Sequence, residues 1–347
     1  MHCISEPYAK QLGRIRSACG RAAALRPRGV LAVWSSSPDN VFSKRSVWIS
    51  TTVLRIVKTR DIIDLLMLSI LWGASFLFMR IAVPEFGAFA LAEVRVAIAA
   101  AVLLPIVLTR GNQTEIAANW STLAILGAHN TALPFLLFAY ATLYLTAGTA
   151  GILNATAPIF AAVVARLWLG EKLSTSRALG LVIGIVGIYL LVGDKLSAPG
   201  SGGGLAAVAA IGAALLYGIG GNFARTKAAH ISSMTIAAGT QLASALLLLP
   251  VAIIAWPKQS PSAEAWIAVT MLGILSTGLA YILYFRLIAN VGPTKAITVT
   301  YLIPVFAMIL GAIVIDEAIT PPMLMGGAVI LLGTALATGM LRNPVSR

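Results

Sequence analysis

Apolar runs of about twenty residues, the length that a transmembrane helix needs, follow one another from Asp61 almost to the end of the chain. Short polar or Pro/Gly-rich stretches separate them. The pattern predicts ten helices, near residues 62–82, 89–109, 121–144, 147–168, 176–193, 204–224, 233–255, 265–287, 294–315 and 321–340. We therefore expect an all-α integral membrane protein.

The second half of the chain repeats the first at an offset of 145 residues, which becomes 146 beyond the second helix. The residues that coincide are mostly helix-breaking, aromatic or charged: Trp72-Gly73 with Tyr217-Gly218, Arg80 with Arg225, Pro158 with Pro304, Phe160 with Phe306, and Glu171 with Glu317. Each copy holds five helices. Because five is odd, the copies have opposite orientations in the membrane, which is the inverted-repeat architecture of many secondary transporters. The expected domains are a first repeat over 61–193 and a second over 203–340.

Composition supports the membrane interpretation, since 59% of the residues are hydrophobic and 11% are charged, far from the balance of a soluble domain. The net charge of +13 is concentrated in a leader, residues 1–60, which holds 11 of the 25 Lys and Arg residues. We interpret the leader as a disordered tail or a misplaced start, and less readily as a transit peptide. Because the body has no basic stripe with interleaved aromatic residues, we expect no nucleic-acid partner.

The loops indicate the orientation. With the leader in the cytoplasm, the inside loops hold ten basic residues and the outside loops hold three, Arg80, Lys195 and Lys258. By the positive-inside rule, this predicts a multi-pass protein of the cell membrane, inner or plasma, with both termini in the cytoplasm.

Two prolines mark a candidate substrate site. Pro158 and Pro304 lie in the middle of the fourth and ninth predicted helices, and each frees the carbonyl four residues earlier, on Asn154 and Thr300. In lipid, a freed carbonyl must find a partner or line a wet cavity. All four residues are candidates for substrate binding; the alternative, that Asn154 and Thr300 only bond neighbouring helices, has equal weight.

Glu93 and Arg95 are charged residues within the second predicted helix, where charges are costly and tend to face a cavity or a partner. Two residues apart, they do not face each other. Glu93 is a candidate for binding a proton or a substrate amine. For Arg95 we favour a structural charge near the outer headgroups.

Polar and aromatic residues supply further candidates. The pair Asn130-Thr131 aligns with Ser276-Thr277 in the repeat, which indicates a polar cavity lining and makes Asn130 a candidate. Tyr281 and Tyr301 are candidates for stacking on a substrate, although tyrosines also form interface belts. A lone histidine such as His129 is more often structural.

Glycines recur in the last helix of each half, at Gly180, Gly184 and Gly187 and at Gly326 and Gly333. Small residues allow helices to approach closely in membranes. We interpret them as packing positions, and contact between the two halves is one arrangement that they would allow.

The chain contains no H-E-x-x-H zinc motif, no G-x-S-x-G elbow and no P-loop. With three histidines in all, a metal or triad site is not expected. We therefore expect no enzyme activity and no cofactor, and transport driven by a gradient rather than by ATP.

Over about residues 61–340 the chain resembles the EamA-like branch of the drug/metabolite transporter superfamily. The resemblance rests first on the segment Leu71–Phe76 and on Glu93 with Arg95. Each half then continues with the same ordered features: the proline of helix four or nine, the turn Gly170–Lys172 or Asp316-Glu317, and a Gly-rich last helix. The resemblance implies ten helices, cytoplasmic termini, and transport of small solutes, often export of amino acids, related metabolites or toxic compounds.

Two features depart from the family pattern. Members begin a few residues before the first helix, so the leader favours a misplaced start. In the second half, Ala238 and Thr240 stand where Glu93 and Arg95 lie, so the site is expected to be asymmetric.

The function expected is gradient-driven export of small metabolites, such as amino acids, related compounds or drugs, by alternating access. The expected partners are a small-molecule substrate and membrane lipid; proton or ion coupling and a homodimer are compatible with the sequence. One alternative is a carrier of phosphorylated sugars or nucleotide-sugars, which would need clustered cations. Another is a non-transporting membrane receptor.

Overall fold

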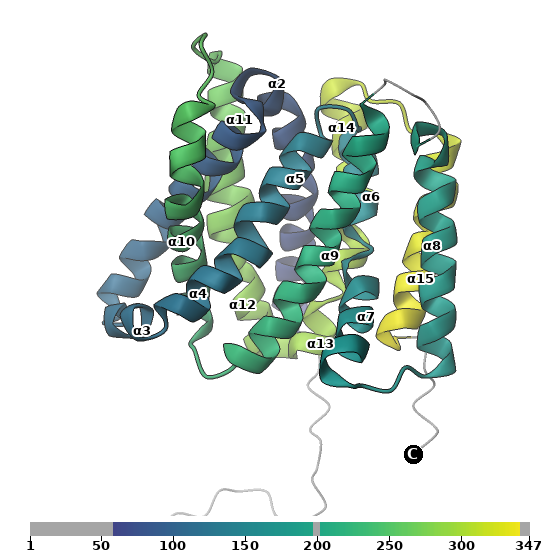
Figure 1. Cartoon of the computed structure of the whole chain (residues 1–347), viewed down its shortest axis with the longest axis horizontal. Coiled ribbons are helices and arrows are strands. Elements are labelled where there is room, and N and C mark those ends of the chain that lie inside the picture. The colour runs from purple at the N-terminus through teal and green to yellow at the C-terminus, as the bar shows by residue number, and fades with distance from the viewer. Residues whose placement is uncertain (1–57, 197–201, 341–347) are drawn as a thin grey trace, which may run out of the picture. The chain divides into compact units, whose positions relative to one another are not determined.

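The computed structural model describes residues 58–196 and 202–340, and the predicted leader lies outside them except for its last three residues. Every secondary-structure element in these described ranges is helical. The helices run side by side in one bundle (Figure 1). This confirms the all-α membrane fold.

The first repeat crosses the bundle five times. Its elements are α2 (Thr59–Thr109), α3 (Gln113–Ala118), α4 (Trp120–Gly127), η1 (Ala128–Ala132), α5 (Leu133–Ala141), α6 (Ala147–Asn154), α7 (Ala157–Leu169) and α8 (Thr175–Leu196). α2 supplies two crossings that meet at Gly87, where φ is 70° and ψ is 164°. Only glycine adopts this conformation readily, so Gly87 permits the turn between the first two crossings.

The second repeat crosses five times as well. Its elements are α9 (Gly203–Lys227), α10 (Ser233–Ile254), α11 (Ala263–Gly273), η2 (Ile274–Leu279), α12 (Ala280–Val291), α13 (Pro293–Ala296), α14 (Val299–Ile315) and α15 (Pro321–Thr338). Eight helical segments of the described chain are long and apolar enough to span a membrane. The second crossing within α2 and the shorter apolar α14 complete the ten.

Two local predictions were wrong. The stretch between the second and third predicted helices, which we expected to be a connector, contains the short helix α3. The fourth crossing breaks after Asn154, so Pro158 lies in the first turn of α7 rather than in mid-helix. Proline is well placed there, because the first N–H groups of a helix have no intrahelical acceptor. In the ninth crossing the break precedes Val299, and Pro304 does lie inside α14.

The two halves pack crosswise. A Cβ on Gly73 of α2 would lie 2.7 Å from the Phe306 Cβ of α14, and a Cβ on Gly218 of α9 would lie 2.7 Å from the Ala161 nitrogen of α7. The first helix of each half therefore packs against the fourth helix of the other. Both contacts depend on a glycine at the same repeat position.

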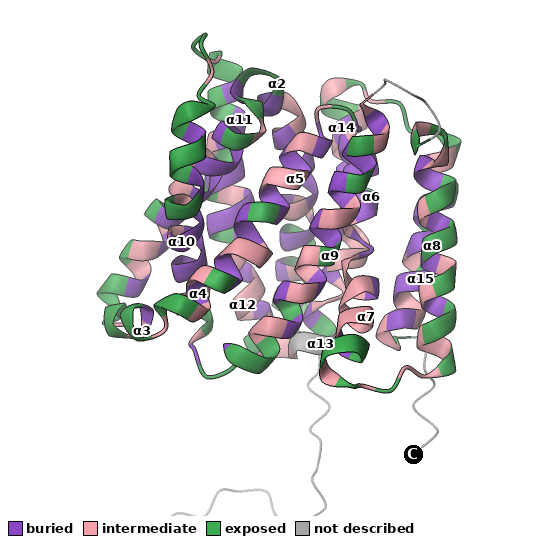
Figure 2. Cartoon of the chain, viewed as in Figure 1, coloured by how far each residue is buried: buried purple, intermediate pink, exposed green. Residues whose placement is uncertain are grey.

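The last helices of the two halves, α8 and α15, also pack against each other through glycines. A Cβ on Gly180 would lie 2.5 Å from the Ala337 nitrogen, and a Cβ on Gly187 would lie 2.8 Å from the Ile330 nitrogen. The packing role predicted for these glycines, between the halves, is confirmed. The opposite face of α8 exposes large apolar residues such as Leu179 and Tyr189, as expected for a lipid-facing surface (Figure 2).

Carboxylates at the bundle ends join the halves. The Glu115 side chain of α3 accepts hydrogen bonds from the Ser232 backbone N–H (2.9 Å) and from the Ser232 and Thr235 hydroxyl groups, at the start of α10. The Thr235 and Ser232 donors hold the pKa of the Glu115 carboxyl below its ordinary value. At the other end, Glu85 accepts two bonds from Ser262 at the start of α11.

The substitution Gly333→Ala tests the α8–α15 contact. The added methyl would lie 2.6 Å from the Gly184 nitrogen and 2.7 Å from the Gly180 oxygen. Overpacking of this kind costs about 1–3 kcal/mol. We expect that loss in the free energy of unfolding, measured by denaturant titration in detergent.

The matched control is Gly212→Ala in α9, which carries the same gain in helix propensity but would meet only the Leu137 Cδ1, at 3.7 Å. Equal stability changes in both variants would contradict the close-packing interpretation.

Candidate functional site

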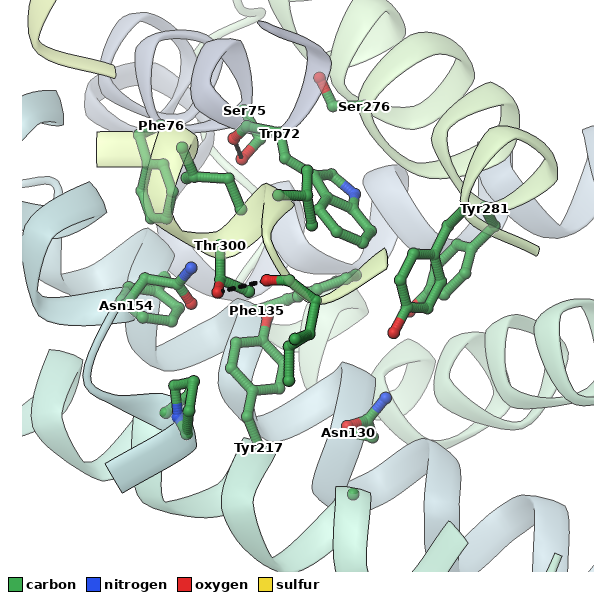
Figure 3. A pocket seen from close by; sticks show the side chains of 18 of the residues that line it. Trp72, Ser75, Phe76, Asn130, Phe135, Asn154, Tyr217, Ser276, Tyr281 and Thr300 are labelled. Atoms are coloured by element: carbon green, nitrogen blue, oxygen red, sulfur yellow. Dashed lines mark hydrogen bonds between the residues drawn. The ribbon is translucent and has the colours of Figure 1, made fainter. Parts of the chain in front are cut away.

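A cavity of about 320 Å³ lies between the two halves. The first half contributes residues from α2, η1, α5 and the α6–α7 break; the second contributes residues from α9, η2, α12 and the start of α14. No residue of α8, α10 or α15 lines it. Figure 3 shows side chains from both halves arranged around this space, and the volume is within the range of small-molecule sites.

Aromatic side chains form much of the cavity wall. Trp72 packs against Tyr284 with ring centroids 5.1 Å apart, and Phe138 packs against Phe76 at 5.4 Å and Tyr217 at 6.1 Å. Trp72 and Tyr217 are repeat partners, so the first helix of each half contributes one aromatic residue to the cavity wall. The wall is suited to an apolar or aromatic body.

Asn130 and Ser276 bring polar side chains to the cavity from two π-helical turns, η1 and η2. These turns lie at equivalent positions of the two halves. A π-turn leaves a local irregularity in the helical hydrogen bonding, and such turns frequently occur at functional sites. The polar lining predicted from the recurring pairs is therefore provided by distorted helices.

The breaks in the fourth and ninth crossings also border the cavity. Asn154 ends α6, and Pro158 lies in the first turn of α7. Thr300 lies in the first turn of α14, where its Oγ1 donates a hydrogen bond to the Ile297 oxygen (2.8 Å; Figure 3). Irregular backbone at membrane depth is tolerated where it lines a cavity.

Arg95 is the one charged residue among the lining residues. It is 5% exposed, its Nε donates to the Thr277 Oγ1 (3.0 Å), and its guanidinium carbon lies 3.5 Å from the centroid of the Phe135 ring. From the sequence, we interpreted Arg95 as a structural charge near the outer headgroups. However, the helix restarts after Gly87, and seven residues of α-helix carry Arg95 about 10 Å inward.

The structure brings together five of the eight residues that the sequence singled out. The lining residues are Asn130, Asn154, Pro158, Tyr281 and Thr300.

The other three are not among the lining residues. Glu93 is 7% exposed, and its Oε2 has no hydrogen-bond partner among the described residues. The Tyr301 hydroxyl shares a 2.9 Å hydrogen bond with the Thr338 hydroxyl of α15. Pro304 is buried within α14.

The sequence indicated a cavity-lining role for the pair that contains Ser276, but gave no site role to Trp72, although Trp72 lies in a segment that coincides in the repeat. That coincidence was the available signal. His129 bonds the Ile125 oxygen of its own helix through Nδ1 (2.9 Å) and does not line the cavity. Within the described residues, no cluster of His, Cys, Asp or Glu side chains is suited to holding a metal ion.

A bundle of two inverted helical repeats around a shared cavity defines a multi-span membrane protein with the architecture of a secondary transporter. The model of the EamA-like transporter family matches residues 61–193 and 204–339. The chain belongs to this family.

Several relatives are named as transporters. The uncharacterized transporter YoaV of Bacillus subtilis is 23% identical, covering 80% of this chain and 96% of its own. The uncharacterized inner membrane transporter YedA of Escherichia coli is 29% identical, covering 70% of this chain and 79% of its own. A probable terminal-alkyne amino-acid exporter of Streptantibioticus cattleyicolor is 23% identical, covering 76% of this chain and 89% of its own.

A solved crystal structure is also similar, with a TM-score of 0.58 at 22% identity, covering 82% of this chain and 99% of its own. At this identity the likeness supports the fold alone.

A cysteine at Gly221 tests whether the cavity admits solutes. A Cβ there would have no neighbour within 4 Å, and Gly221 lines the cavity. In a Cys3→Ser/Cys19→Ser background, which removes both native thiols, we expect the Gly221→Cys thiol to react with a small methanethiosulfonate reagent. The rate should exceed that of Ala213→Cys, in the buried core of the same helix, by at least about tenfold, because reactivity follows exposure. Equal rates would contradict an accessible cavity.

Proposed function

We propose that this protein is a secondary transporter that exports small metabolites, such as amino acids, related compounds or drugs, by alternating access. The observation that carries the proposal is the cavity between inverted halves, lined by corresponding elements of each. Two inverted units can rock about a central site and open it to either side.

Two ion pairs support the alternation. Arg80 of α2 pairs with Glu317, which follows α14 (3.3 Å), and its repeat partner Arg225 of α9 pairs with Glu171, which follows α7 (2.6 Å). Each pair joins one half to the other, and the pairs lie at opposite ends of the bundle. Alternating access requires such a symmetric pair of closures, one for each side.

The two closures are unequal. Glu317 is 10% exposed and also accepts a 2.8 Å hydrogen bond from the Ala147 N–H, whereas Glu171 is 40% exposed. The Arg80 Nη1 donates to two further carbonyls, of Thr142 and Leu143. The Arg80 end is therefore the more firmly closed of the two.

Export and orientation rest on charge and on one relative. Arg80 lies near the turn at Gly87, so its end of the bundle is opposite the end at which α2 begins. Basic loops such as that with Lys172 and Arg177 lie at the latter end, so the positive-inside rule favours cytoplasmic termini and a cell-membrane location. A relative named as a probable terminal-alkyne amino-acid exporter supports the outward direction.

Glu93 is our candidate for coupling to a proton gradient. Its carboxyl is buried on α2, outside the cavity lining and two residues from Arg95, and its Oε2 has no hydrogen-bond partner among the described residues. Intramembrane carboxyls of this kind mark proton pathways in transporters.

A carrier of phosphorylated sugars is the weaker alternative, because phosphate sites use clustered cations and the cavity lining has a single one. A receptor would bind a solute without moving it. Neither has an observation of its own in its favour.

Flux measurements in proteoliposomes test the proposal. With a panel of amino acids and drugs, we expect flux that increases when a pH gradient is imposed. Glu93→Gln should remove most of that increase, since glutamine cannot carry a proton, while leaving thermal stability nearly unchanged.

The exposed Glu264→Gln is the matched control and should behave as wild type. Absence of flux for the whole panel would overturn the transporter proposal; gradient-dependent flux in Glu93→Gln would remove Glu93 from the coupling.

Neutralising each closure tests the alternation. In the Gly221→Cys background, we expect Glu317→Gln to raise the reaction rate from the Arg80 side of the membrane severalfold, because it weakens that closure. Glu171→Gln should raise reactivity from the opposite side only. An impermeant thiol reagent applied to each face of oriented vesicles measures both, and identical responses of the two variants would contradict symmetric closures.

A further inference from the structure

Arg95 stands out because it is a buried cation without a counter-ion. The ion pairs formed within the described residues use Arg80, Arg177, Arg225 and Arg286. No Asp or Glu is among the residues that line the cavity around Arg95. A guanidinium keeps its charge when buried, and a buried charge without a partner is costly.

The contacts of Arg95 orient it without neutralising it. Nε donates to the Thr277 hydroxyl (3.0 Å), Nη1 donates only to the weakly accepting Met79 sulfur (3.7 Å), and one face of the guanidinium covers the Phe135 ring. Nη2 has no hydrogen bond to a described residue. The Nη1–Nη2 edge is therefore free for an incoming acceptor, and that edge fits a carboxylate through two parallel hydrogen bonds.

Two helix N-termini add positive potential to the same cavity. α7 begins at Ala157 and α14 at Val299, and both residues line the cavity. The N-terminal end of a helix carries about half a positive charge. In transporters with broken helices, such ends point at the anionic group of the substrate.

The second half of the chain has no counterpart of the cationic site at Arg95. Thr240, the repeat partner of Arg95, bonds the Ile236 carbonyl of its own helix and does not line the cavity. The single positive charge of one guanidinium matches the single negative charge of a carboxylate better than the double negative charge of a phosphate. The aromatic wall around Trp72 and Tyr217 suits an apolar or aromatic body, and the carbonyl end of α6 at Asn154 suits a ligand N–H or O–H group.

We propose that Arg95 binds a carboxylate of the transported solute, so that the substrate class is a small organic acid with an apolar or aromatic body. The inference rests on the proposed transport function. The carboxylate supplies the counter-ion that Arg95 lacks in the protein, and the aromatic residues hold the remainder of the solute.

Matched pairs in which an uncharged amide group replaces the carboxylate test the proposal: indole-3-acetate with indole-3-acetamide, and phenylalanine with phenylalaninamide. In wild-type proteoliposomes, we expect the acid of at least one pair to be carried at least about tenfold faster than its amide, as loss of a hydrogen bond to a charged group implies. Arg95→Gln should remove this preference, and Arg95→Lys should keep part of it. Size-exclusion profiles and melting temperatures check that both variants fold.

A binding measurement separates the two levels of the proposal. In the Gly221→Cys protein, the acid should slow thiol modification and the amide should not. Acids and amides carried equally well by wild type would overturn the carboxylate site and leave the transporter intact. Protection by the acid without flux would uphold the site and overturn transport. Neither protection nor flux for any pair would overturn the inference, while flux of other solutes would still support a transporter.

Discussion

The structure depends above all on the need to satisfy backbone hydrogen bonds inside a bilayer. In lipid, an unpaired N–H or C=O group costs several kcal/mol, so the chain crosses as helices. The exceptions at membrane depth are the π-turns η1 and η2 and the breaks before α7 and before α14. All four border the cavity, where water or a solute can satisfy the groups that the irregular backbone leaves free.

Close packing of inverted copies then determines how the cavity forms. Gly73 and Gly218 let the first helix of each half cross the fourth helix of the other, which brings Trp72 and Tyr217 to one space. α8 and α15 pack on each other away from the cavity, and α10 does not line it. Symmetric packing thus surrounds a site whose charge is asymmetric, since Arg95 has no charged counterpart in the second half.

The same asymmetry extends to the bundle ends. The Arg80–Glu317 and Arg225–Glu171 pairs are equivalent in the repeat, yet the first is more buried and has more hydrogen-bond partners. An ion pair is worth more when it is shielded from water than when it is exposed. The two ends of the bundle are therefore joined with unequal strength.

The sequence by itself determined the ten crossings, the inverted repeat and much of the polar lining, because hydrophobic length and fixed offsets are properties of the chain alone. Asn130, Asn154 and Thr300 were found in this way. The sequence did not determine how deep a side chain lies in the membrane or which neighbours it faces. Arg95 was taken for a charge near the headgroups and Pro158 for a mid-helix kink, because the break after Asn154 and the turn at Gly87 depend on how neighbouring helices pack. The spacing of Glu93 and Arg95 already predicted that the two side chains do not face each other, but only the tertiary structure decided that Arg95, and not Glu93, reaches the cavity. The reason is that a side chain's surroundings are set by the helices that pack against it, and these come from distant parts of the sequence.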